Sequence, residues 1–141
     1  MQHLTSADLI KIGVFALFGA VGLGAYYAIT LTPFLLPFIG VGVFFAFAYP
    51  LPSYIAGGRF HNNFSFAFSW GFLPFLTSYY INSLSITPQA LLFGVTMALV
   101  SWIEIVLSRF VRKARKEGLP TSFYEAPEVA LKLLVVLVYS L

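Results

Sequence analysis

Residues 9–29 read LIKIGVFALFGAVGLGAYYAI, and this stretch decides the fold of the chain. It is apolar throughout except for Lys11 near its start. A helix needs roughly 20 apolar residues to cross the hydrocarbon core of a bilayer, and this stretch is long enough. It is too long for the apolar region of a signal peptide and has no small-residue cleavage site. We therefore predict a membrane-spanning helix here.

Three further apolar stretches follow, at about residues 34–49, 64–81 and 89–107. Pro74 lies inside the third predicted span, where its missing N–H predicts a kink. A last apolar stretch, Val129 to Leu141, has only 13 residues. A helix of that length rises about 20 Å, less than the roughly 30 Å thickness of the core. We predict an all-α integral membrane bundle with four full spans and a partial fifth, forming one transmembrane domain over residues 1–141.

The composition agrees with a membrane environment. Hydrophobic residues make up 60% of the chain and charged residues 9%, whereas soluble domains have about 45–50% and about 25%. So few charges cannot cover the surface of a water-soluble fold of 141 residues. The absence of Cys excludes disulfides, thiolate nucleophiles and Cys-ligated metals.

Small residues recur at four-residue spacing in two of the predicted spans. Such stripes let helix backbones approach closely in a membrane, where dispersion replaces the hydrophobic drive. We expect them to pack against other helices of this chain or of a partner, although Gly and Ala are also common in spans generally. The stripes are Ala16, Ala20, Gly24 and Ala28 in the first span, and Ala90, Gly94 and Ala98 in the fourth.

The cations are distributed asymmetrically between the predicted loops. The loops at residues 30–33 and 82–88 carry no charge. The positive-inside rule places Lys- and Arg-rich loops in the cytoplasm. We therefore predict a protein of the cytoplasmic membrane whose N-terminus, 50–63 loop and 109–127 loop face the cytoplasm. The cations of that side are Lys11, Arg59, Arg109, Arg112, Lys113, Arg115 and Lys116.

The loop at residues 50–63 is a candidate phosphate-binding segment. Gly57 and Gly58 give the backbone freedom, and Arg59 and His61 supply a cationic fork and a titratable ring. Flexible backbone amides with a cation are what a phosphate needs. The alternative is an ordinary cytoplasmic loop, in which Arg59 follows the orientation rule and Asn63 caps the third helix.

The segment after the fourth span is the most basic part of the chain. Arg109, Arg112, Lys113 and Lys116 share one face if the helix continues beyond the membrane. That face would suit a diphosphate or anionic lipid headgroups. The alternative is an anchor that only fixes orientation. Nucleic acid is not an expected partner, because no soluble domain accompanies the cluster.

One acidic residue lies within a predicted span. Glu104 is near the cytoplasmic end of the fourth span, and an ionisable group at membrane depth is a functional candidate. It could orient a substrate, or it could simply face the bundle or the interface. The five acidic residues of the chain are scattered, and His3 and His61 are far apart, so we predict no metal site and no catalytic triad.

The order of these landmarks resembles the central part of the UbiA superfamily of membrane prenyltransferases. The resemblance rests on a helix ending Phe47-Ala48-Tyr49-Pro50, a basic Gly-containing loop, and a helix with Gly71 and Pro74 in a Gly-x-x-Pro arrangement. Ile86-Thr87-Pro88 then opens a further helix. The resemblance covers residues 5–118, and it rests on the order and spacing of these landmarks.

The resemblance implies a helical bundle with a cytoplasm-facing cavity and an isoprenyl diphosphate held through Mg²⁺ by two Asp-rich motifs. Family members also use basic residues of the cytoplasmic loops to bind the diphosphate, and the resemblance implies this role for one residue here, Arg59. The second motif would fall at residues 108–118, which contain no Asp, and only eight residues precede the first span. Mg²⁺ is therefore expected only if these motifs are supplied elsewhere, and the chain is expected to be part of a larger UbiA-like domain or a divergent branch.

Two functions from different classes follow. The first is a UbiA-like protein related to enzymes that transfer an isoprenyl group from a diphosphate donor to an acceptor, incomplete or catalytically divergent in this chain. The second is a non-catalytic membrane subunit or anionic-lipid-binding protein. It would use the small-residue stripe for partner helices and the basic face for lipid.

Overall fold

The computed structural model describes residues 5–49 and 58–140, and every regular element in that part of the chain is helical. Helix α1 is Ser6–Thr30 and begins with a capping box, in which the Thr5 hydroxyl accepts from the Asp8 N–H. A 3₁₀ turn at Pro33–Leu35 then leads into α2, Leu36–Ala48.

The third predicted span is not one regular helix. It consists of α3 (Asn63–Ala67), a π-helical turn (Phe68–Phe72) and α4 (Leu73–Ser83), which together we call the α3–α4 segment. Pro74 follows this π turn, in the first turn of α4, and the kink predicted there stays a prediction. Asn62, not Asn63, caps α3, because its Oδ1 accepts from the Ser65 N–H at 2.8 Å.

Helix α5, Pro88–Lys116, has 29 residues and is capped by the Thr87 hydroxyl. The chain then turns at Gly118, whose φ of +68° favours glycine, and passes through a 3₁₀ turn at Thr121–Phe123. Helix α6, Glu125–Ser140, runs back along the C-terminal part of α5.

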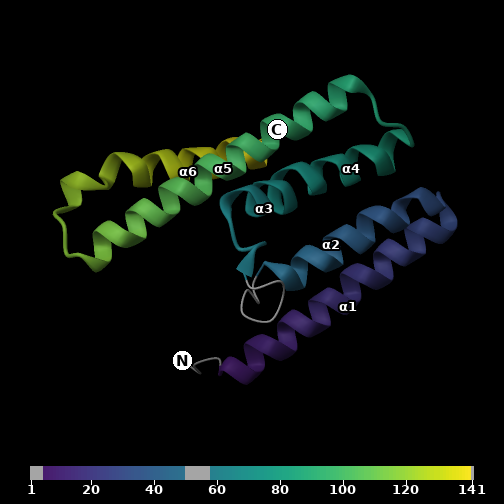
Figure 1. Cartoon of the computed structure of the whole chain (residues 1–141), viewed down its shortest axis with the longest axis horizontal. Coiled ribbons are helices and arrows are strands. Elements are labelled where there is room, and N and C mark those ends of the chain that lie inside the picture. The colour runs from purple at the N-terminus through teal and green to yellow at the C-terminus, as the bar shows by residue number, and fades with distance from the viewer. Residues whose placement is uncertain (1–4, 50–57, 141) are drawn as a thin grey trace.

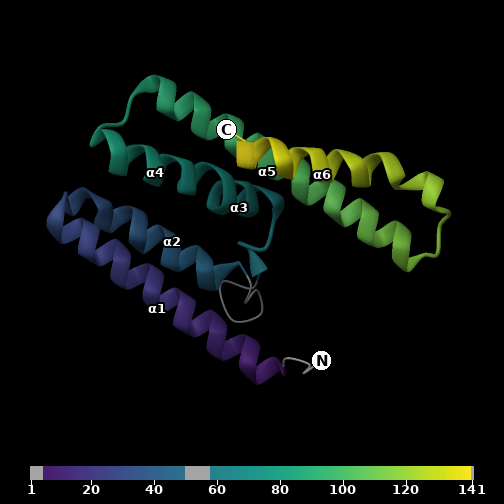
Figure 2. The ribbon, with the colours of Figure 1, turned by 180° about the vertical axis from the view of Figure 1, so that it is seen from behind.

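The helices lie side by side in chain order and alternate in direction (Figures 1 and 2). The α1–α2 and α4–α5 connections are at one end of the molecule. The start of α1, the facing ends of α2 and α3 and the α5–α6 turn are at the other end, beyond which α5 and α6 project. All the loops that carry cations therefore lie toward one end of the bundle.

Two helices of the described residues are long and apolar enough to cross a membrane, by length and composition. They comprise Ile10–Thr30 and Pro88–Lys116. The second predicted span is a shorter apolar helical run, Pro33–Ala48, and the third is divided by its π turn. The structure thus supports an all-α fold with two long apolar helices, and by this measure it does not contain four full spans.

Apolar side chains cover much of the exterior. The chain exposes 10148 Å², whereas a soluble monomer of 15.6 kDa exposes about 7,200 Å². Phe15 and Ile29 on α1 are 82% and 84% exposed. Large exposed apolar areas mark a surface that meets something other than water, which is consistent with a membrane.

Small residues mark the places where helices pack closely. A Cβ on Gly71 would lie 2.8 Å from the Ala98 Cα, so the two backbones are in contact there. Gly94 packs under the Phe72 ring in the same interface, and Ala90 is buried. On α1, Gly24 meets Ile39 of α2.

The first stripe is only partly used within the chain. Ala28 is buried with Leu35 and Tyr80 in a small core at the end of the bundle that carries no charged loop. Ala16 and Ala20, at the other end of the stripe, are exposed. The expected contact of these two residues with a partner helix stays a prediction.

Candidate functional site

An apolar groove of about 510 Å³ runs between α1, α2 and the α3–α4 segment. A volume of this order suits a small molecule or a lipid chain. Ala20 and Gly24 line the groove on the α1 side, and their small size leaves space there. Gly42 does the same on the α2 side. The full lining is Leu17, Ala20, Val21, Gly24, Phe38, Ile39, Gly42, Val43, Ser69, Leu73, Pro74, Thr77, Ser78 and Ile81.

A second hollow, of about 320 Å³, continues the groove toward the C-terminal end of α2. It shares Gly42, Ser69 and Pro74 with the first and ends at Tyr49. Trp70 forms part of its wall. Through their shared residues the two hollows form an apolar path that reaches Tyr49 at the C-terminal end of α2. That end of α2 lies toward the end of the molecule with the charged loops (Figure 1).

Tyr49 connects this path to the loop with the predicted phosphate-binding residues. The His61 ring stacks on the Tyr49 ring at 4.8 Å, and its Nδ1 is 2.8 Å from the Tyr49 carbonyl oxygen. A carbonyl can only accept, so Nδ1 carries the proton in this contact. In the neutral ring, Nε2 is then an acceptor, and His61 binds an anion only when its ring is charged.

Arg59 is exposed in a turn with a defined backbone. The His61 N–H donates to the Gly58 carbonyl at 3.0 Å, and the Asn62 side chain donates to the Arg59 carbonyl at 2.6 Å. The Arg59 guanidinium has no ion-pair partner among the described residues. It is therefore available to an anion, whereas Gly57 and the rest of residues 50–57 lie outside the described part.

The predicted basic face of α5 exists, and it points away from α6. Val111 and Ala114 are buried on the side of α5 that α6 covers, whereas the four predicted residues are exposed on the other side. Helical spacing of about 100° per residue explains the separation. The four residues are Arg109, Arg112, Lys113 and Lys116.

Not all four cations of this face are equally free. Lys113 pairs with Glu117 at 3.8 Å. The Arg112 Nε donates to the Ser108 carbonyl at 3.2 Å, which leaves its terminal nitrogens exposed. Arg109 and Lys116 have no ion-pair partner within the described part of the chain.

Arg115 joins α5 to α6 instead of contributing to the basic face. Its guanidinium lies 2.6 Å from the Glu128 carboxylate and 5.6 Å from the centre of the Tyr124 ring. Lys132 pairs with the same carboxylate at 3.1 Å. Hydrogen bonds from Arg115 and then Lys132 lower the pKa of Glu128 below its ordinary value. The sequence alone did not indicate this cluster.

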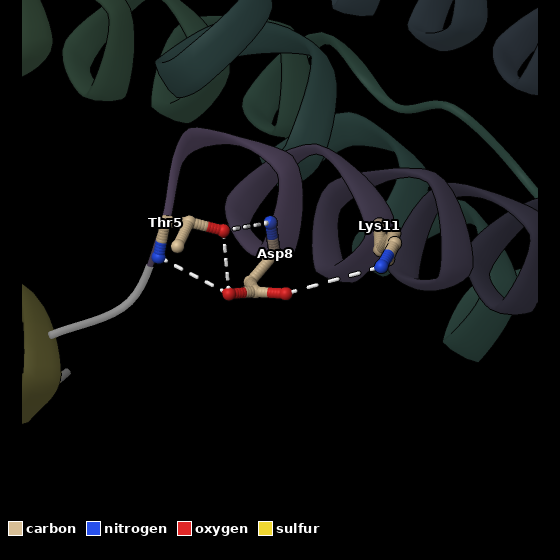
Figure 3. A network of polar contacts seen from close by, with 3 residues as sticks. All are labelled: Thr5, Asp8 and Lys11. Atoms are coloured by element: carbon tan, nitrogen blue, oxygen red, sulfur yellow. Dashed lines mark hydrogen bonds and ion pairs between the residues drawn. The ribbon is translucent and has the colours of Figure 1, made fainter. Parts of the chain in front are cut away.

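The N-terminal end of α1 carries a separate polar network (Figure 3). The Asp8 carboxylate accepts from the Thr5 hydroxyl at 2.6 Å and from the Thr5 N–H at 3.1 Å, and it faces Lys11 at 4.0 Å. The hydrogen bonds from Thr5 lower the pKa of Asp8. Lys11, one of the predicted orientation cations, is thus held beside a carboxylate.

Glu104 is half-buried on α5 and makes no hydrogen bond or ion pair with the described residues. No group of three or more His, Cys, Asp or Glu side chains in residues 5–49 and 58–140 could hold a metal ion. Arg59 and His61 lie before α3, whereas the basic face lies on α5. Among the described residues, no hydrogen bond or ion pair joins these two groups of cations.

The groove is the feature that the sequence did not reveal. Its polar lining residues, Ser69, Thr77 and Ser78, lie in a span that reads as uniformly apolar with occasional hydroxyls. Pro74 was the one local signal, because it indicated an irregularity in the helix that carries them.

Comparison with models of protein families, with curated proteins and with solved structures found no match for this chain.

Proposed function

We propose that the chain is an integral membrane protein that binds an amphipathic anionic lipid, with an isoprenyl diphosphate as its ligand class. One observation carries the proposal. The apolar groove leads to Tyr49, at the end of the molecule toward which the exposed cations lie. An isoprenyl chain would lie in the groove, and its diphosphate would emerge beside Arg59. The UbiA-like order of landmarks supports the choice of an isoprenoid.

The membrane topology that we propose has four spans and a partly inserted α6. The α3–α4 segment is continuous from Asn63 to Ser83 and uncharged. The run Pro33–Ala48 rises about 24 Å, which a locally thinned bilayer accommodates. The positive-inside rule then assigns Arg59 and the end of α5 to the cytoplasm.

The chemistry of binding requires cations that are not already paired. Arg59, Arg109 and Lys116 meet this condition among the described residues. Arginine offers a diphosphate two parallel N–H donors and keeps its charge. Without clustered carboxylates to hold Mg²⁺, the chain alone binds the diphosphate but lacks the electrophile that assists its departure.

The test is binding of a fluorescent isoprenyl diphosphate to the full chain in lipid nanodiscs. We expect saturable binding that Arg59→Gln weakens by about ten- to a hundredfold, since a hydrogen bond to a charged group contributes about 1.5–3 kcal/mol. Lys132→Gln is the control, because Lys132 pairs with Glu128 on α6. Equal affinity in Arg59→Gln and the unmodified chain would contradict the proposal.

The alternative is a non-catalytic subunit that binds anionic phospholipid, and the exposed basic face of α5 favours it. Phosphatidylglycerol at equal concentration separates the two ligand classes. If it displaces the isoprenyl diphosphate as well as unlabelled isoprenyl diphosphate does, the alternative holds. Prenyl transfer by this chain with added Mg²⁺ is expected to be absent, and clear turnover would show that the metal argument is wrong.

A further inference from the structure

A backbone carbonyl without a donor lies on the groove wall, in the π-helical turn Phe68–Phe72. The Leu73 N–H donates to the Phe68 carbonyl, five residues back. The next carbonyl in this ladder belongs to Ser69, and its donor would be the N–H of residue 74. Residue 74 is Pro, which has no N–H. Within residues 5–49 and 58–140, no side chain donates to this carbonyl.

The Ser69 carbonyl opens onto the groove. Ser69 and Pro74 line both hollows, and a helical carbonyl points toward the C-terminal end of its helix. The oxygen therefore lies between these two residues on the groove side. It is also near the middle of the α3–α4 segment, where a bilayer supplies no water to satisfy it. A carbonyl that faces neither water nor a donor is costly, so a ligand that supplies a donor is favoured.

Two of the three hydroxyls on the same wall already donate within their own helix. The Ser69 Oγ donates to the Ser65 carbonyl at 2.7 Å, and the Thr77 Oγ1 donates to the Leu73 carbonyl at 2.7 Å. A hydroxyl has a single hydrogen, so both groups present lone pairs to the groove. This part of the groove therefore offers acceptors to a ligand's hydrogen-bond donor, and the Ser78 hydroxyl, which makes no hydrogen bond among the described residues, remains free to donate.

We propose that the groove also binds, in competition with the isoprenyl diphosphate, an uncharged lipid whose hydroxyl group donates to the Ser69 carbonyl. This rests on the proposed function, because it takes the groove to be the site of a lipid chain. The apolar lining suits the hydrocarbon part of such a lipid. A hydroxyl is the donor that fits, because an ammonium at the centre of the bilayer carries the cost of a charge there.

The first test compares a long-chain isoprenoid alcohol with its methyl ether as competitors of the fluorescent lipid. We expect the alcohol to bind about three- to tenfold more tightly, the range given by one net hydrogen bond. Pro74→Ala restores the missing N–H, and we expect it to bring the two affinities together. Pro37→Ala, in the first turn of α2, is the control and retains the preference.

Equal affinities of the unmodified chain for alcohol and ether would overturn the inference, as would an unchanged preference in Pro74→Ala. These outcomes are distinct from failure of the proposed function. If the fluorescent isoprenyl diphosphate does not bind saturably, the proposed function falls; if it binds but neither lipid displaces it, only the further inference falls. If both displace it equally, only the selection of a hydroxyl falls.

A second measurement needs no variant. Both Trp residues follow a Ser, so ¹³C-carbonyl Ser with ¹⁵N-Trp yields NMR signals only from Ser69-Trp70 and Ser101-Trp102. We expect the Ser69 carbonyl shift to change with the alcohol and not with the ether. The Ser101 signal, from the uninterrupted helix α5, is the internal control. A Ser69 carbonyl shift that does not change when the alcohol is added would overturn the inference.

Discussion

At residue 71 the α3–α4 segment and α5 come into backbone contact, and this contact fixes one wall of the bundle. A Cβ there would lie 2.7 Å from the Met97 carbonyl carbon and 2.8 Å from the Ala98 Cα. Backbone atoms cannot move aside as a flexible side chain can. We expect Gly71→Ala to destabilise the fold by about 1–3 kcal/mol, the usual cost of overpacking.

The measurement is thermal unfolding in detergent, where this loss corresponds to a Tm lower by roughly 5–10 °C. Gly40→Ala is the matched control, because nothing lies within 4 Å of a Cβ on Gly40. Alanine is the better helix former, so the control keeps or slightly raises the Tm. A Gly71→Ala protein as stable as the control would show that the two helices are not this close.

Single residues show what could and could not be predicted from the sequence. Gly71 and Pro74 were identifiable as landmarks of their span, but the contact of Gly71 with α5 depends on tertiary packing. The N-cap of α3 was predicted one residue late, at Asn63 instead of Asn62, because adjacent Asn residues have equal capping propensity. The exposed basic face of α5 followed directly from helical spacing.

At the scale of elements, α6 is joined to α5 by the Glu128 carboxylate, which Arg115 and Lys132 both contact. These partners lower the folded-state pKa of Glu128 below its ordinary value of 4.5. The stabilisation is therefore present above pH 4.5 and is lost as the pH falls through the folded-state pKa. We expect the first turns of α6 to detach from α5 in acid and to stay docked at neutral pH.

Hydrogen exchange of residues 125–134 is the measurement. Glu128→Gln is expected to speed this exchange at neutral pH and to remove its dependence on acid. Glu125→Gln is the control, since Glu125 is exposed in the same helix turn and has no ion pair among described residues. Equal hydrogen exchange in the two variants would mean that the ion pairs of Glu128 do not hold α6 against α5.

The elements differed in how far the sequence predicted them. The long apolar helices α1 and α5 were predictable because length and hydropathy alone decide them. The π turn at Phe68–Phe72 was not, because Pro74 indicates an irregular helix without specifying its form. The groove was also beyond prediction, because it is made where α1, α2 and the α3–α4 segment meet, and no single stretch encodes it.

At the scale of the whole molecule, the alternating direction of the helices explains the sorting of the charges. Each helix returns the chain to the opposite end, so the loops with cations and the loops without them separate (Figure 2). A bilayer across this bundle would meet the exposed apolar side chains of α1 and α5. The fold thus gathers the cations at one end of the bundle, which is the arrangement that the predicted orientation requires.

Cysteine labelling tests this orientation directly, because the native chain has no Cys and every introduced one is unique. We expect an impermeant maleimide outside intact cells to label Ser85→Cys, in the α4–α5 connection, and to spare Arg59→Cys and Lys113→Cys. The latter two should react only after the membrane is opened. Labelling of residues 59 and 113 from opposite sides would contradict the antiparallel arrangement. The chain between these two residues would then have to cross the membrane an odd number of times, whereas the α3–α4 segment and α5 together would cross it twice.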